Sequence, residues 1–218
     1  MAFLIASPWN SLSLTIILIA LIGLKWTLLF ILLSAIIALI SGLIFNALII
    51  KGVLPSNPAR QDLPKSEPFL KNLKEVWHSA KINPKTFYRM GMNGIGESRM
   101  ILRWIFLGVI LAALFQTFLS TDQFQTFFGP DLMGLGITLP VATIIETCSE
   151  GTAPIAADIL NRAAAPGNAF TFMMTGAATD YTEILGLKET TGSWKIPLFL
   201  PLVTVPQVLL ISYLINVL

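Results

Sequence analysis

Long apolar runs alternate with short polar stretches along the whole chain. Residues 1–50 hold one charged side chain, Lys25 beside Gly23, which divides the run into two pieces of roughly 20 residues, the length that a spanning helix needs. This pattern predicts a tight transmembrane helical hairpin. Two further runs of spanning length cover residues 100–120 and residues 196–218, the second with three prolines that kink the helix or delay its start.

Residues 51–100 are polar and basic by contrast. This section, extended to Arg103, holds ten of the fourteen Lys and Arg residues, so the positive-inside rule predicts that it is cytoplasmic. It opens with LPSNPARQDLPKSEP, which is typical of an extended linker. In the next stretch, EPFLKNLKEVWHSAK, apolar residues recur at helical spacing opposite basic ones. We expect an amphipathic helix that lies on the anionic membrane surface or packs on the protein's own cytoplasmic face.

The composition supports an integral membrane protein. Hydrophobic residues make up 55% of the chain and charged residues 12%, so the bilayer is the main solvent. Backbone groups in lipid must be satisfied internally, and the predicted fold class is therefore all-α: a polytopic helical bundle with broken or re-entrant helices around a mid-membrane site. Residues 101–218 form its core. The stretch STDQFQTFFGPD carries acids and no bases, and we expect it to be an external loop.

Several classes of chemistry are disfavoured. The one cysteine, Cys148, cannot form an internal disulfide, and the one histidine, His78, argues against haem ligation, a two-histidine metal site or a Ser-His-Asp triad. The chain has no phosphate-binding Gly-rich Lys-Ser/Thr motif. The net charge of +2 and the position of the basic residues beside membrane helices disfavour nucleic acid as a partner. We therefore expect no enzyme activity, no cofactor, and membrane lipid as a partner.

A polar stretch, ETCSEGTAP, interrupts the apolar sequence at residues 146–154. A carboxylate in a spanning segment normally faces a protein interior or a wet cavity. Glycine and proline here predict that the helix unwinds near residues 149–153 and restarts with Pro154 in its first turn. The restarting half-helix would aim backbone N–H groups into the site. The residues that this break supplies to the predicted site are Glu146, Cys148, Ser149, Glu150, Gly151 and Pro154.

A second interruption, MMTGAATDYTEI, follows about thirty residues downstream. Paired interruptions of hydrophobic segments point to a transporter's binding site. It contains Gly176, Thr179, Asp180 and Glu183, of which the first three join the predicted site. Between the breaks, Asp158 and Arg162 have i, i+4 spacing and are expected to pair. The alternative is that these acids cap helices or lie near interfaces.

The order of these features resembles the ArsP/YraQ-type predicted permeases. In this chain the corresponding elements read LPVATIIETCSEGTAPIAADILNRAAAPGNAFTFMMTGAATD, from Leu139 to Asp180. A final hydrophobic span follows them. The resemblance implies a permease core in residues 101–218, and efflux of a small solute or a soft metal or metalloid species. It makes Cys148 the soft ligand, with Gly176, Thr179 and Asp180 as the opposing break. Where many members have Cys-Ser-Cys, Glu150 fills the second cysteine position, which favours a harder cation or a proton-coupled solute.

The resemblance also implies that two related halves build the pathway in typical, longer members. This chain carries one such motif, so we expect a homodimer in which a second copy replaces the missing half. Transport would be driven by an ion or proton gradient, with Glu146, Glu150 and Asp180 as candidate proton carriers.

Two other functions stay open. An accessory membrane subunit predicts that neutralising Glu146 and Glu150 leaves function unchanged. An intramembrane aspartyl protease would use Asp158 and Asp180. In all three cases we expect a multi-pass protein of the inner (cytoplasmic) membrane with a cytoplasmic N-terminus. The positive-inside rule favours a cytoplasmic position for Arg162, Lys188 and Lys195, and therefore an external C-terminus. Residues 132–187 either cross the membrane fully or re-enter on the same side.

Overall fold

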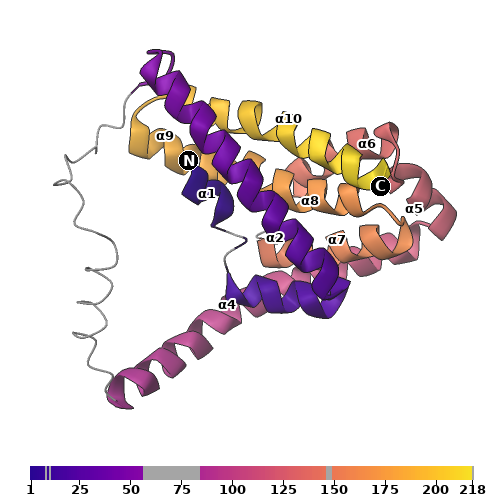
Figure 1. The fold of residues 1–218 in the computed structure, drawn as a ribbon. Helices are drawn as coiled ribbons and strands as arrows, with labels where there is room; N and C mark the ends of the chain where they lie inside the picture. The colour runs from indigo at the N-terminus through magenta and orange to yellow at the C-terminus, as the bar shows by residue number, and fades with distance from the viewer. Residues whose placement is uncertain (8, 10, 56–83, 146–148, 218) are drawn as a thin grey trace. The chain divides into compact units, whose positions relative to one another are not determined.

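A computed structural model describes the chain except for residues 8, 10, 56–83, 146–148 and 218. Every regular element in these described ranges is a helix (Figure 1). The fold class predicted from the sequence, an all-α polytopic membrane protein, is confirmed. In chain order the helices are α1 (Ala2–Ala6), α2 (Leu12–Ile50), α4 (Pro84–Phe118), α5 (Thr121–Phe128), α6 (Leu132–Ile145), α7 (Ser149–Arg162), α8 (Pro166–Thr179), α9 (Tyr181–Thr191) and α10 (Lys195–Val217).

The chain forms two compact units. Met1–Pro55 and Arg103–Leu218 make the first, and Ser56–Leu102 makes the second. The described part of the second unit is the first half of α4, which begins at Pro84. The amphipathic helix expected within the basic section lies outside the described residues, and the domain limits read from the sequence stay predictions.

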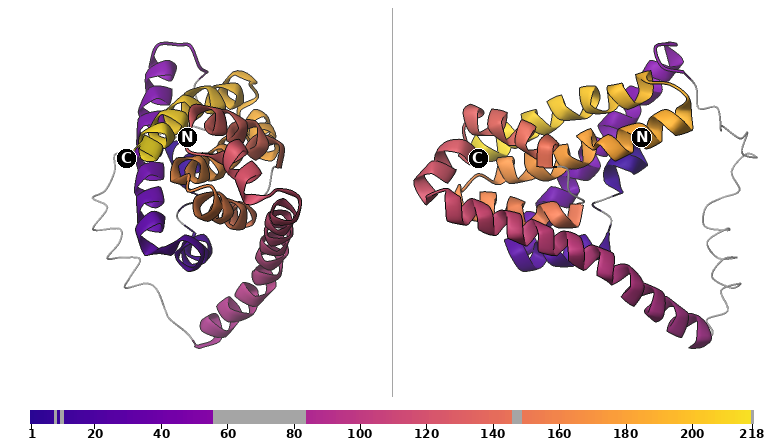
Figure 2. Two further views of the ribbon diagram at one scale, coloured as in Figure 1. Left: turned by 90° about the vertical axis from the view of Figure 1, so that its right-hand side faces the viewer. Right: turned by 180° about the vertical axis from the view of Figure 1, so that it is seen from behind.

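Three helices are long and apolar enough to cross a membrane. In the part of the chain that the structure describes, they are Leu12–Ile50, Ile101–Phe118 and Lys195–Val217. All three lie in the predicted apolar runs, but the run predicted to form two spans is one long helix. In α2 the helix is interrupted at Gly23, whose φ of 81° and ψ of 164° suit a residue without a Cβ. The two pieces of α2 meet at an angle there (Figure 2). The break falls where the sequence places it, and the tight hairpin stays a prediction.

The expected external loop after the third span contains a helix instead. Helix α5 begins with a capping box, in which the Ser120 hydroxyl accepts from Gln123 N and the Gln123 side chain accepts from Ser120 N. Phe124 and Phe128 bury the apolar face of α5. The axis bends by 90° between α5 and α6, so this pair is either one broken span or a re-entrant loop.

Helix α6 starts near α5, and helix α7 ends beside α5. Gln125 on α5 donates to the carbonyl oxygen of Arg162, the last residue of α7, at 3.0 Å, and α6 starts a few residues after α5. Each helix has 14 residues and is therefore about 21 Å long, short of the roughly 30 Å apolar core of a bilayer. The two helices form a hairpin, and neither helix alone reaches across that core. Arg162 was expected on the cytoplasmic side and residues 120–131 on the external side. Because Arg162 lies beside α5, which belongs to residues 120–131, the two expectations contradict each other.

Helix α8 occupies the middle of the first unit. It packs against α6, α7 and α10, and Phe170 also contacts Trp9 and Phe30 (Figures 1 and 2). All of its residues from Gly167 to Gly176 are buried. Helix α9 continues α8 after a break, and α10 returns beside α8 to the end of the bundle that holds α5.

Candidate functional site

The two predicted interruptions both coincide with helix ends. Helix α8 ends at Thr179, Asp180 has non-helical ψ (124°), and α9 starts at Tyr181. Helix α6 ends at Ile145 and α7 starts at Ser149. The predicted unwinding of residues 149–153 is wrong, because those residues are helical and Pro154 lies inside α7. Pro154 removes only the bond to the Glu150 carbonyl, whereas the helical residues 151–159 are all buried.

One hydrogen bond and one close packing contact join the tip of the α6–α7 hairpin to the end of α8. The Thr179 hydroxyl lies 3.2 Å from the Thr143 hydroxyl, two residues before α6 ends. A Cβ added to Gly176 would lie 3.7 Å from Cγ2 of Thr152 in the first turn of α7. Residues on both sides of the α6–α7 break therefore contact residues just before the α8–α9 break. This arrangement brings the predicted site residues Gly176 and Thr179 beside the start of α7.

Glu150 receives partners from a distant part of the chain. The Ser13 hydroxyl at the start of α2 donates to its Oε1 at 3.3 Å, and the Ser149 hydroxyl donates to Oε2 at 3.3 Å. Ser13 is itself linked to the N-cap residue Ser11 at 2.6 Å. The N-termini of α2 and α7 thus converge on one carboxylate. Ser11, Ser13 and Thr143 were not predicted from the sequence to lie in this region.

Gly151 has a packing role. A Cβ on Gly108 of α4 would overlap the carbonyl oxygen of Gly151, so these two helices touch at backbone distance. Gly108 and Ala112, one turn apart, are buried on α4 and leave room for this approach. The close contact fixes the first turn of α7, which carries Glu150, against α4.

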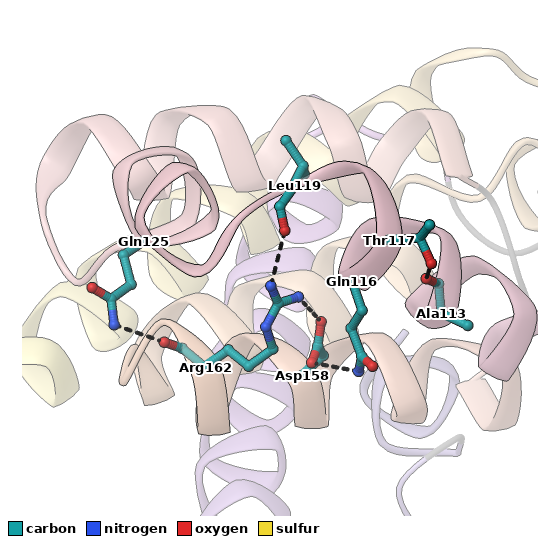
Figure 3. A network of polar contacts seen from close by, with 7 residues as sticks. All are labelled: Ala113, Gln116, Thr117, Leu119, Gln125, Asp158 and Arg162. Carbon is teal, nitrogen blue, oxygen red and sulfur yellow. Dashed lines mark hydrogen bonds and ion pairs between the residues drawn. The ribbon is translucent and has the colours of Figure 1, made fainter.

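The predicted pair Asp158–Arg162 is confirmed, with 3.0 Å between Oδ2 and Nη1 (Figure 3). Gln116 of α4 donates to the other carboxylate oxygen at 3.0 Å, and Arg162 donates to the Leu119 carbonyl at 3.1 Å. The Arg162 guanidinium also lies 4.4 Å from the centre of the Phe124 ring. A cavity of about 290 Å³ lies beside this network between α2, α4 and α7, with Pro154, Ala157 and Asp158 on its α7 wall.

The two aspartates of the protease hypothesis lie apart. Thr152 of α7 lies beside Gly176 of α8, and the two helices run in opposite directions. Asp158 therefore lies on one side of this contact along the bundle axis, and Asp180 lies on the other. Six residues of α7 and four of α8 separate them by about 15 Å along the bundle. Asp158 is also held by Arg162 and Gln116. A catalytic pair that shares one proton needs its carboxyl groups in contact, which this arrangement disfavours.

Two predicted site residues, Glu146 and Cys148, lie outside the described residues. Within the described ranges no group of three His, Cys, Asp or Glu side chains could hold a metal ion. Glu183 in the first turn of α9 is a further titratable group next to the second break. Burial, and then the charge of Asp180, raise the pKa of Glu183 from 4.5 to about 6.

The fold and the paired helix breaks define a multi-pass helical membrane protein with a bent helix pair, a class that includes many transporters. The chain belongs to the ArsP_1 family of predicted permeases, whose family model matches residues 1–217. Membership covers nearly the whole chain, whereas the motif resemblance began at Leu139. It makes the protein a membrane transporter in the general sense. No curated protein and no solved structure matches the chain.

Proposed function

We propose that the protein exports a small solute or a soft metal or metalloid species through the region where the α6–α7 hairpin tip meets the end of α8. The observation that carries this proposal is the Thr143–Thr179 hydrogen bond, because it joins the two broken segments. Backbone groups freed at such breaks are tolerated in a membrane where they line a polar pathway. The ends of α6 and α8 and the start of α7 supply such groups at one place.

The proposed site offers several polar side chains. Glu150 and Asp180 flank the meeting point from α7 and from the α8–α9 break, and the hydroxyls of Ser149 and Thr179 lie between helix ends. We infer that gradient energy enters through protonation of these carboxylates, with Glu146 as a further candidate. Glu183, whose pKa burial raises to about 6, joins this group.

Cys148 is the proposed soft ligand. A thiolate suits trivalent arsenic or Cu(I), and a helix N-terminus close by would stabilise it. One thiol is a weak site for such species, so we propose that two copies of the chain act together and contribute two. The mass of the detergent-purified protein checks this point: a dimer is expected, and a monomer that transports contradicts it.

Thermal unfolding in detergent tests the proposed ligand. The protein is heated with a trivalent methylarsenical, Cu(I), Zn²⁺ or simple oxyanions, because a ligand that binds only the native state raises the midpoint. We expect the methylarsenical or Cu(I) to raise the midpoint of the wild type and of Ser193→Ala, a control far along the chain. Cys148→Ser should abolish the shift and Glu150→Gln should reduce it.

The same experiment separates the proposal from an accessory role. The bonds from Ser13 and Ser149 to Glu150 would also suit a purely structural carboxylate. If no ligand shifts the wild type, and Glu150→Gln unfolds at a higher temperature, the thiol site is refuted for this panel. An accessory subunit then becomes the better account.

A further inference from the structure

Helix α8 carries a polar stripe through the centre of the bundle. Asn168, Thr171, Thr175 and Thr179 follow one another at spacings of three, four and four residues, so they share one face of the helix. The first three are fully buried, at 0% exposure. The stripe runs from the end of the bundle that holds α5 to the break at Asp180. The rest of that buried surface is apolar, with Phe170, Phe172, Met173 and Met174 among its members.

Three members of the stripe bond to neighbouring helices. Asn168 donates to the carbonyls of Phe128 and Gly129 and accepts from Asn216 at 2.8 Å. Thr171 is 2.7 Å from the Ser212 hydroxyl of α10. Thr179 bonds to Thr143 of α6. These pairs place Thr175 between α6 and α10, one turn from the bonded members on either side.

Thr175 is the exception in the stripe, because its hydroxyl has no hydrogen-bond partner among the described residues. Every other fully buried threonine has one. Thr27, Thr138 and Thr204 donate to a carbonyl four residues earlier in their own helix, and Thr152 donates to one three residues earlier. A hydroxyl in a helix can normally rotate to such a carbonyl. Leaving it unpaired in the interior destabilises the fold, so its retention needs another reason.

We propose that the solute path extends from the helix breaks along the polar stripe of α8, and that Thr175 contacts the solute. This inference rests on the proposed transport function and narrows its substrate. The stripe offers hydroxyl and amide groups and no charged side chain, so it suits an uncharged solute better than an ion. The path therefore takes small uncharged species with O–H or N–H groups. It is closed in this conformation, since its three inner members are fully buried.

Single-cysteine labelling tests the path without knowledge of the substrate. Cys148 is the only cysteine, so Cys148→Ser gives a chain without thiols. Thr175→Cys, Thr179→Cys and Thr204→Cys are introduced separately, and membranes are treated with 2-hydroxyethyl methanethiosulfonate. A thiol in dry surroundings stays protonated and inert. We expect Thr175→Cys to react at least about tenfold faster than Thr204→Cys, a buried threonine whose hydroxyl is bonded within α10.

The other labelling outcomes are informative in different ways. If Thr175→Cys reacts as slowly as Thr204→Cys while Thr179→Cys reacts quickly, the path along α8 is refuted and the proposed site at the breaks stands. If all three are inert, the break region is dry as well, and both the path and the proposed function are contradicted.

A valine pair separates solute contact from a structural role. Thr171→Val leaves Ser212 without its partner and should lower the unfolding temperature in detergent. Thr175→Val removes an unpaired hydroxyl and keeps the shape, so it should unfold at or above the wild-type temperature. If Thr175→Val lowers the unfolding temperature as much as Thr171→Val, the hydroxyl serves the fold and the inference is wrong.

Discussion

Helices α8 and α4 bury opposite kinds of surface. Helix α8 is buried on all sides and carries polar residues through the bundle centre. The membrane-spanning part of α4, Ile101–Phe118, has only 11% of its residues buried, and in the first unit those are the small residues Gly108 and Ala112. Lipid drives no apolar face inward, so close contact between small residues and interhelical hydrogen bonds hold such helices together. Polarity on α8 therefore marks the interior, whereas apolar bulk on α4 marks the surface.

The largest expected effect comes from a pair of phenylalanines. Phe170 of α8 has 0% exposure and contacts the rings of Trp9 and Phe30, so Phe170→Ala should lower the free energy of unfolding by about 3 kcal/mol or more. Phe106 of α4 is 67% exposed, and Phe106→Ala should change it by less than about 0.5 kcal/mol. Unfolding in a denaturing detergent measures both. Equal losses would show that α4 is buried like α8.

The glycines of α4 sharpen the comparison at its one close contact. Gly108→Ala should destabilise the protein by about 1–3 kcal/mol, because its Cβ would overlap the Gly151 carbonyl. Gly94→Ala on the same helix has open space around its Cβ and should stabilise by up to about 1 kcal/mol through higher helix propensity. The unfolding midpoints of the two variants, compared with that of the wild type, test both predictions. A neutral Gly108→Ala would mean that α4 and α7 do not touch.

The smallest effect is expected at the far end of α8, where the chain continues into α9. Because burial raises the pKa of Glu183, the folded state favours the protonated form. This stabilisation is complete below pH 4.5 and is lost as the pH rises through about 6. Glu183→Gln should therefore flatten the stability profile in that window. At pH 7 the substitution should raise the free energy of unfolding by at most about 1 kcal/mol, since solvent screens this partly exposed group.

Glu189→Gln on the exposed side of α9 is the matched control for this prediction. It should leave the profile unchanged between pH 4.5 and pH 6. A wild-type profile that is already flat in this window would mean that the pKa of Glu183 is not raised.

Hydropathy and charge predicted the spans, the break at Asp180 and the Asp158–Arg162 pair, because these depend on residues close in sequence. Helix α5 was missed although Ser120 and Gln123 have capping-box spacing, since the stretch has acids and no bases and was therefore expected to be an external loop. The helical state of residues 149–153 depends on burial against α8, α2 and α4, which no local pattern reveals. The bonds from Ser13 to Glu150 and from Thr179 to Thr143 join distant segments through ordinary hydroxyls, so only the fold brings them together. The roles predicted for Glu146 and Cys148 stay predictions.

The most direct test of the transport site is the accumulation of a trivalent methylarsenical by inside-out vesicles that contain the protein. The account predicts that the wild type accumulates it, that Cys148→Ser and Thr179→Val lose most of this activity, and that the surface variant Phe106→Ala keeps it. Wild-type accumulation that survives in both site variants would contradict a site at the hairpin tip and the end of α8.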